Sequence, residues 1–411
     1  MQHHYDTLEI RSPDERLAEQ LARLPRQVAH AKSRTPAFAQ LFADVDPDQV
    51  TSLDALARLP VTRKSQLLEL QKSARPFGGF VASDSGYRRV FASPGPIYEP
   101  EGTVADYWRF ARSLYAAGFR GGDLVHNTYS YHFTPAGSMF ETGAAALGCR
   151  VFAAGTGQTE LQVQAIADLK PSGYVGTPSF LKIILEKADV LGADASSLGK
   201  AQVSGEPFPP SLRDTLLQRG IAAYQVYGTA DLGSIAYETP AREGLVVDEG
   251  VIVEIVRPGT GDPVAPGEVG EVVVTTLHNT DYPLIRFGTG DLSAVLAGTS
   301  PCGRTNTRIK GWMGRADQTT KVRGMFVHPG QVADVMRRHP QIRRARLTVD
   351  NPDGNDRMTL HAELTGSSGD MASAIVASLR EVTKLRGEVA FHPLGELPND
   401  GKVIEDLRKF D

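Results

Sequence analysis

Cysteine, long apolar runs and an excess of charge are all scarce in this sequence. The two cysteines, Cys149 and Cys302, lie far apart, so neither a disulfide framework nor a thiolate metal site is indicated. No apolar run approaches the roughly 20 residues that span a bilayer, and the chain does not begin with a basic stretch followed by an apolar core. These absences predict a cytoplasmic protein that has no membrane partner.

Charge and composition exclude further classes. The 44 Lys and Arg residues against 48 Asp and Glu give a net charge of -4, which supplies no basic field for a phosphate backbone, so no nucleic-acid partner is expected. Apolar residues make up 41% and charged residues 22%, near the average for soluble proteins and unlike disordered or fibrous chains. A chain of 411 residues exceeds what one core usually supports, so we expect two domains.

The longer, N-terminal part of the chain predicts a layered α/β domain. Apolar residues at helical spacing over residues 15–29 predict an amphipathic helix, broken or kinked at Pro25. From residue 87 to residue 227 short apolar strands alternate with helical segments, which indicates parallel sheets flanked by helices. Residues 244–295 are rich in strand formers and turn signals, so a small antiparallel β unit is expected to close this domain.

The remaining residues predict a separate, smaller domain of the β-α-β-β-α-β type. The predicted fold class is therefore α/β, with a large multi-layer N-terminal domain over residues 1–316 and a small α+β C-terminal domain over residues 317–411. Strands are expected at 322–327, 345–349, 358–363 and 389–392, and helices at 329–338 and 371–385.

Two glycine-containing segments suit the base of a nucleotide. Residues 204–207 read Ser-Gly-Glu-Pro and residues 224–231 read Tyr-Gln-Val-Tyr-Gly-Thr-Ala-Asp, each next to an apolar strand. Glycines at such places let a flat ring approach the backbone closely, and Tyr227 offers an aromatic face on which a base can stack.

A third stretch suits the sugar and the phosphate. Residues 283–291 read Pro-Leu-Ile-Arg-Phe-Gly-Thr-Gly-Asp, and the carboxylate of Asp291 at this tight turn can accept hydrogen bonds from two vicinal hydroxyls. Residues 314–324 follow with Gly-Arg-Ala-Asp-Gln-Thr-Thr-Lys-Val-Arg-Gly, in which the planar guanidinium of Arg315 suits anionic oxygens.

Read together, these segments resemble the phenylacetate–coenzyme A ligase branch of the adenylate-forming enzymes, over nearly the whole chain. The resemblance implies that Asp291 binds ribose, that Arg315 lies near the nucleotide phosphate, and that Asp231, where the family has Glu, holds Mg²⁺. An acid at a helix N-terminus is the alternative for Asp231. The resemblance also implies a rotating C-terminal domain with Asp317 as its hinge. The residues that would hold the adenine are Gly205, Glu206, Pro207, Gln225, Val226, Tyr227, Gly228 and Thr229.

The resemblance extends to an acyl pocket and to a lysine near the end of the chain. Residues expected to line the acyl pocket are Tyr131, His132, Phe133 and Ala136; the alternative is that Tyr131 and Phe133 are ordinary core aromatics. Lys402 matches a lysine that neutralises charge between the acid and the α-phosphate during adenylation. On its own, such a lysine is a solvated charge.

The phosphate-binding loop departs from the family. Relatives read approximately Ser-Ser-Gly-Thr-Thr-Gly-Lys-Pro, whereas residues 93–100 here read Ser-Pro-Gly-Pro-Ile-Tyr-Glu-Pro. Such loops bind the β- and γ-phosphates with backbone N–H groups, hydroxyls and a cation. Here two prolines donate no N–H, and Glu99 brings a negative charge where a lysine stood. The loop therefore predicts weak ATP binding with AMP binding preserved.

The implied function is an acid–thiol ligase that uses ATP, Mg²⁺ and coenzyme A to activate a carboxylic acid of aromatic type. A homodimer is suggested by resemblance alone. Two alternatives stay open because of the altered loop. One is an ATP-independent acyltransferase that starts from a preformed thioester or adenylate, and the other is a non-catalytic protein that binds nucleotide or acyl-CoA. Retention of Asp291, Arg315, Asp317 and Lys402 argues against the second alternative.

Overall fold

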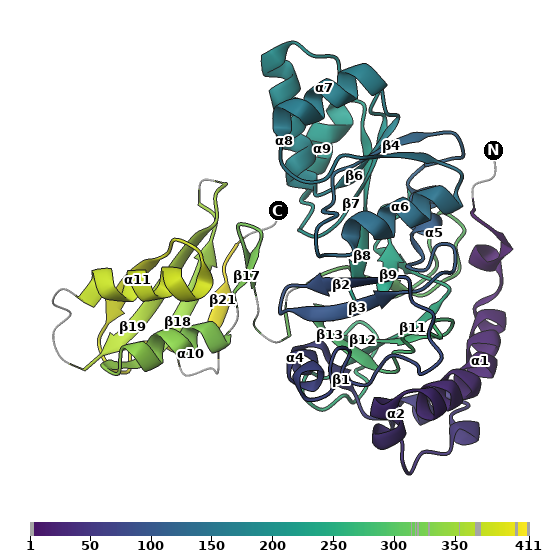
Figure 1. Ribbon diagram of the computed structural model, residues 1–411, viewed down its shortest axis with the longest axis horizontal. Helices are drawn as coiled ribbons and strands as arrows, with labels where there is room; N and C mark the ends of the chain where they lie inside the picture. The colour runs from purple at the N-terminus through teal and green to yellow at the C-terminus, as the bar shows by residue number, and fades with distance from the viewer. Residues whose placement is uncertain are drawn as a thin grey trace. The chain divides into compact units, whose positions relative to one another are not determined.

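The computed structural model describes residues 4–313, 315–316, 318, 320–327, 329–352, 354–365, 371–398 and 402–408. The chain divides into two compact units, residues 1–314 and residues 315–411, each with its own sheets and core (Figure 1). No helix within the described residues is long and apolar enough to cross a membrane.

The first unit begins with helix α1 (Pro13–Arg34), which runs unbroken through Pro25, so the predicted break is wrong. A capping box starts the helix, because the Ser12 hydroxyl accepts the Glu15 N–H while the Glu15 carboxylate accepts the Ser12 N–H. Leu24 and Val28 are fully buried, and this packing outweighs the local disadvantage of a proline. Three short helices follow: α2 (Pro36–Leu41), α3 (Leu53–Ala57) and α4 (Lys64–Ser73).

A nine-stranded sheet forms the centre of the first unit, and the predicted alternation of strands and helices is confirmed. Strands β5, β4, β6, β7 and β8 are parallel neighbours, while β9, β10, β15 and β14 continue the sheet in antiparallel fashion. Their bounds are β4 (Leu124–Asn127), β5 (Arg150–Ala153), β6 (Gly173–Gly176), β7 (Lys200–Val203), β8 (Ala222–Thr229), β9 (Gly233–Tyr237), β10 (Leu245–Val247), β14 (Val295–Leu296) and β15 (Arg308–Ile309).

Helices cover both faces of this sheet. Tyr174 packs with the helices of one face, whereas its neighbour Val175 packs with those of the other, as expected for alternating side chains of a strand. Because the strands are parallel, the segments that follow β4, β6, β7 and β8 meet at one edge, where ligands of such sheets usually bind. The helices are α7 (Thr159–Leu169), α8 (Pro178–Leu191) and α9 (Pro210–Gln218) on the first face and α5 (Phe110–Ala116) and α6 (Ala136–Ala146) on the second.

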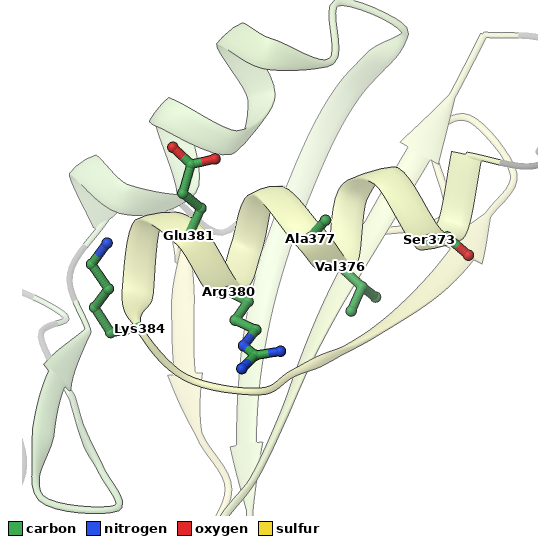
Figure 2. Close-up of a pocket in the computed structure, with 6 residues that line it drawn as sticks. All are labelled: Ser373, Val376, Ala377, Arg380, Glu381 and Lys384. Atoms are coloured by element: carbon green, nitrogen blue, oxygen red, sulfur yellow. The ribbon is translucent and has the colours of Figure 1, made fainter.

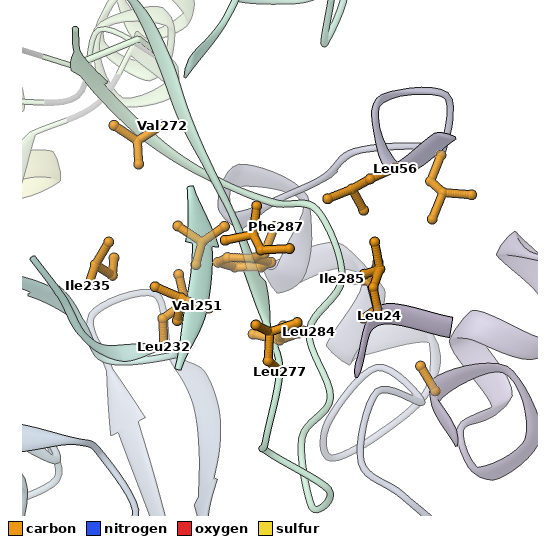
Figure 3. Packing of buried hydrophobic residues seen from close by; sticks show 14 of the residues in the cluster. Leu24, Leu56, Leu232, Ile235, Val251, Val272, Leu277, Leu284, Ile285 and Phe287 are labelled. Carbon is orange, nitrogen blue, oxygen red and sulfur yellow. The ribbon is translucent and has the colours of Figure 1, made fainter. Parts of the chain in front are cut away.

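The predicted small β unit is a second sheet, in which three antiparallel strands and one short parallel strand follow the order β1-β13-β12-β11. Its apolar face packs against α1, and Figure 3 shows Leu24 of α1 beside Ile285 in this cluster. The strands are β1 (Thr62–Arg63), β11 (Val251–Val256), β12 (Gly270–Thr276) and β13 (Phe287–Ser293).

The altered phosphate-loop segment is a β-hairpin that the sequence did not predict. Strand β2 (Arg89–Ser93) pairs with β3 (Ile97–Glu101) in antiparallel register, so that Ser93 lies opposite Ile97 and Phe91 opposite Glu99. Ile97 is buried in the same apolar cluster as α1, which fixes the tip of the hairpin to the body of the unit.

The second unit has the predicted β-α-β-β-α-β order with two differences. The strand expected at 322–327 is a two-stranded hairpin, because Arg323 and Gly324 adopt positive φ and reverse the chain. A final strand, β21, pairs parallel with β18 and was not predicted. The elements are β16 (Thr320–Val322), β17 (Met325–Val327), α10 (Pro329–Arg338), β18 (Ile342–Asp350), β19 (Arg357–Leu364), α11 (Met371–Thr383), β20 (Glu388–His392) and β21 (Ile404–Asp406).

A shallow hollow on the second unit is lined by a single helix and brings no groups together from different elements. Its lining comes from α11 and the residue just after it, and Figure 2 shows Glu381 directed toward the neighbouring helix. Glu381 forms a 2.9 Å ion pair with Arg338 of α10, so this carboxylate serves helix packing. The lining residues are Ser373, Val376, Ala377, Arg380, Glu381 and Lys384.

Candidate nucleotide site

The segment after β7 is held by a carboxylate at the start of α8. Gly205 has a φ of +85°, which a residue with a side chain rarely adopts. Glu206 Oε1 accepts the backbone N–H of Ser179 at 2.6 Å, in the first turn of α8, where a negative charge is favourable. The turn of Ser204 to Pro207 is therefore fixed at the edge where the parallel strands end.

The last residues of β8 form the neighbouring wall. The Gln225 N–H donates to Glu238 Oε2 at 3.0 Å, and the Val226 side chain is buried in the apolar cluster beneath. Val226 therefore offers a ligand only its backbone. Gly228 allows the tight crossing to β9, because a Cβ atom there would lie 2.5 Å from the Gly233 carbonyl oxygen. Thr229 Oγ1 accepts the Leu232 N–H at 3.3 Å and closes the turn.

Asp291 is hydrogen-bonded at both of its carboxylate oxygens. The Tyr227 hydroxyl lies 3.0 Å from Oδ2, and the indole Nε1–H of Trp312 donates to Oδ1 at 3.1 Å. The Asp291 N–H donates to Thr289 Oγ1 at 3.1 Å, which fixes the turn itself. An ionised carboxylate accepts hydrogen bonds at both oxygens, which is the property that a pair of ligand hydroxyls would need. Trp312 was not identified from the sequence.

Asp231 lies in the turn between β8 and β9, so the alternative that it is an acid at a helix N-terminus is wrong. Its side chain is buried, and Oδ2 accepts a hydrogen bond from the ammonium of Lys64, the first residue of α4. Oδ1 is also buried but has no hydrogen-bond partner within the described part of the chain. Lys64 is a site residue that sequence reasoning missed.

Glu99 of β3 lies beside this ion pair and is fully buried. Its Oε2 accepts the Ser93 N–H at 3.1 Å, and its Oε1 accepts the Ser93 hydroxyl. Burial raises the pKa of Glu99 to about 8, and the negative charge of Asp231 adds to the rise against the opposing effects of Lys64 and Ser93. The hairpin thus carries a buried acid beside the Lys64–Asp231 ion pair.

The predicted acyl segment lies between β4 and α6 and is attached to the hairpin. The Phe133 carbonyl accepts the Ala92 N–H of β2 at 2.8 Å. Phe133 is 80% exposed, so the alternative that it is a core aromatic is wrong. Tyr131 is half-buried and its hydroxyl accepts the Asn127 Nδ2–H at 2.9 Å, while His132 is exposed and Ala136 is the first residue of α6.

The remaining predicted residues belong to the second unit. Arg315 is at its start, and Asp317 lies outside the described residues. Lys402 comes shortly before β21, is about half exposed, and its Nζ lies 2.9 Å from Glu405 Oε1.

One buried carboxylate oxygen fits a magnesium ligand. No group of three or more His, Cys, Asp or Glu side chains in the described ranges is arranged to hold a metal ion. Mg²⁺ in nucleotide sites usually takes one or two carboxylates and completes its shell with water and substrate phosphates. The orphaned Oδ1 of Asp231 suits one such position.

The fold and this arrangement define an AMP-binding enzyme, and residues 102–280 match the family model described as AMP-binding enzyme. The chain is 34% identical to the phenylacetate-coenzyme A ligase of Aromatoleum evansii over 378 residues, 87% of this chain and 84% of the relative. It is 33% identical to that of Escherichia coli over 386 residues, 88% of this chain and 86% of the relative. The chain therefore belongs to the phenylacetate-coenzyme A ligase family.

The fold is also similar to that of a solved enzyme. A crystal structure of 2-hydroxyisobutyryl-CoA ligase in complex with 2-HIB-AMP and CoA superposes with a TM-score of 0.84 at 23% identity. The match covers 100% of this chain and 93% of that chain. At this identity the likeness establishes the adenylate-forming fold.

Proposed function

We propose that this chain joins a carboxylic acid of aromatic type to coenzyme A through an acyl adenylate. A carboxylate oxygen of the acid attacks the α-phosphorus of ATP and pyrophosphate leaves. The thiol sulfur of coenzyme A then attacks the acyl carbon, AMP leaves, and the thiol proton passes to solvent. Neither step needs a covalent bond to the protein, so the rate comes from positioning and charge stabilisation.

The doubly hydrogen-bonded Asp291 is the observation that carries the proposal. A carboxylate whose two oxygens are oriented by Tyr227 and Trp312 is preorganised to accept the two ribose hydroxyls. The adenine would lie between the turn at Gly205 and the end of β8. Arg315 would contact the α-phosphate.

The second unit supplies the mobile part of the proposed cycle. Lys402 would neutralise charge that develops between acid and α-phosphate, and rotation at Asp317 would then remove it so that coenzyme A can enter. Asp231 would be the protein ligand of Mg²⁺, which when bound neutralises phosphate charge. Lys64 holds the Asp231 carboxylate in place through their ion pair.

The acyl pocket is proposed at the segment from Tyr131 to Ala136. Tyr131 supplies a half-buried aromatic face, and Phe133 and His132 are exposed at the same loop, which suits a flat, partly apolar acid. We also propose a cytoplasmic location and a homodimer, both on the resemblance to relatives.

Relatives of 33–34% identity are ligases, which favours ligation over transfer from a preformed thioester or a purely binding role. The test is acid-dependent ATP–pyrophosphate exchange and thioester formation across a panel of aryl acids that includes phenylacetate. We expect both activities with the same acid. A folded protein that shows neither activity with any acid of the panel contradicts the proposal.

A further inference from the structure

In the hairpin that replaces the phosphate loop, the polar donors already form hydrogen bonds to a residue of the same hairpin. Phosphate loops bind the β- and γ-phosphates through backbone N–H groups, hydroxyls and a nearby cation. At the base of this hairpin tip, both the N–H and the hydroxyl of Ser93 point at Glu99 and not outward. Pro94 and Pro96, which follow Ser93 in the tip, have no N–H to offer.

The nearby cation is engaged in the same cluster. The Lys64 ammonium donates to Asp231, and the charges of both act on the Glu99 carboxyl. Tyr282 completes the surroundings, since its buried hydroxyl has no hydrogen-bond partner among the described residues and its pKa is raised by burial and then by Asp231 and Glu99. The groups facing Glu99 are therefore one ammonium, one carboxylate, one phenol and the Ser93 donors.

The hairpin is also attached to α4 on the side of β3. The Tyr98 N–H donates to Gln71 Oε1 at 2.8 Å, and the Tyr98 carbonyl accepts the Gln71 Nε2–H at 2.9 Å. With Ile97 buried in the core, these two bonds flank Glu99 on the N-terminal side and hold its carboxyl over Ser93. A phosphate can reach the Ser93 donors only if it displaces that carboxyl.

We infer that the Glu99 carboxyl occupies the position that the β- and γ-phosphates would otherwise take. Glu99 is thereby the residue that discriminates triphosphates from monophosphates at this site. The Glu99 carboxyl blocks the β- and γ-phosphate position by occupying its donors. AMP and an acyl adenylate do not reach this position, so Glu99 leaves them unaffected. Pyrophosphate binds weakly for the same reason, which slows the return of the acyl adenylate to ATP. This inference rests on the proposed nucleotide-binding function.

The test is calorimetric titration of the full chain with AMP, Mg-ATP and Mg-pyrophosphate. Glu99→Ala vacates the donors, whereas in Glu99→Gln the amide oxygen can still accept the Ser93 N–H and no carboxyl charge remains. Glu69→Gln is the matched control, because Glu69 is an exposed glutamate of α4 paired with Lys72. We expect Glu99→Ala to strengthen ATP binding about tenfold, the equivalent of one hydrogen bond to a charged group regained, with AMP binding within about twofold of wild type.

Glu99→Gln distinguishes the effect of an occupied Ser93 N–H from the effect of the Glu99 charge. We expect it to bind ATP about as weakly as wild type, because the Ser93 N–H stays occupied when the carboxyl charge is gone. An ATP-to-AMP affinity ratio that stays at the wild-type value in Glu99→Ala, with AMP still bound, overturns the role of Glu99 alone. Absence of AMP binding in every protein, including the Glu69→Gln control, overturns the proposed nucleotide function and this inference with it.

Discussion

At the scale of single residues, the site depends on partners that are distant in sequence. Asp291 and Asp231 could be identified from local motifs, because each follows a glycine-containing turn that resembles the family pattern. Trp312 and Lys64 could not be identified as site residues in this way. Their hydrogen-bond partners lie 21 and 167 residues away in the sequence, so the neighbouring residues do not indicate the contact. Sequence reasoning thus found both carboxylates and Tyr227, and missed Trp312 and Lys64.

Trp312→Phe isolates the orienting role of the indole N–H. The variant keeps the aromatic ring and loses the hydrogen bond to Asp291 Oδ1, which helps to orient the carboxylate that we propose binds ribose. We expect KM for ATP to rise about threefold to tenfold with little change in kcat, as for loss of one hydrogen bond to a charged group. Steady-state ligation kinetics measure this. Tyr227→Phe should act in the same direction; unchanged KM in both variants contradicts the proposed ribose contact.

Glu99 also has a consequence for stability. Its folded pKa of about 8 lies above the ordinary carboxyl value of 4.5, so the native state binds more protons than the unfolded chain between these two values. Stability therefore falls as pH rises through this window, and the loss is complete above pH 8. We expect the thermal-unfolding midpoint of wild type to fall relative to that of Glu99→Gln between pH 5 and pH 8. Parallel curves for the two proteins contradict a raised Glu99 pKa.

At the scale of elements, helices and strands with a regular apolar pattern were predicted correctly, whereas elements that depend on tertiary contacts were not. The alternation of strands and helices before residue 227 follows from apolar periodicity, and the helix at residues 329–338 has the expected bounds. The β2–β3 hairpin was missed because its Pro and Gly residues indicate a loop, while its pairing depends on the burial of Ile97 and Glu99. Strand β21 was missed because its three residues pair with β18, far earlier in the chain.

The continuous α1 makes Pro25 an informative position. Proline within a helix lacks the N–H that would bond to the carbonyl four residues earlier and crowds that carbonyl. We expect Pro25→Ala to restore this bond and to stabilise the protein by about 1–3 kcal/mol. Urea unfolding followed by circular dichroism measures the change. Ala22→Gly, at an exposed position of the same helix, is the control and should destabilise the protein. A Pro25→Ala variant that is less stable than wild type would contradict the prediction and show that the helix requires the proline conformation.

At the scale of the whole molecule, two units share one proposed reaction. The large unit supplies the nucleotide and acyl positions, and the small unit supplies Arg315 and Lys402. Composition and length predicted two domains, and the family resemblance assigned their roles. The position that we propose for Lys402 during catalysis would depend on rotation, a property of the reaction cycle that neither residue types nor their spacing encode.

Lys402→Ala should separate the two half-reactions. We expect acid-dependent pyrophosphate exchange to fall about 10²-fold, since a positioned charge is lost from the adenylation transition state. Thioester formation from a preformed acyl adenylate and coenzyme A should stay near the wild-type rate. Arg380→Ala, which removes an exposed cation from α11 of the same unit, is the control and should leave both half-reactions unchanged (Figure 2). Equal loss of both half-reactions in Lys402→Ala contradicts a role confined to adenylation.

The hydrogen bond between the Phe133 carbonyl and the Ala92 N–H joins the acyl segment to β2. A change of acid that moves this segment therefore also moves the hairpin that carries Ser93. Laboratory evolution toward a bulkier acid should consequently select compensating substitutions within residues 89–101, even under a screen that reports only on the acid. If both proposed roles hold, one backbone hydrogen bond couples the choice of acid to the handling of phosphate.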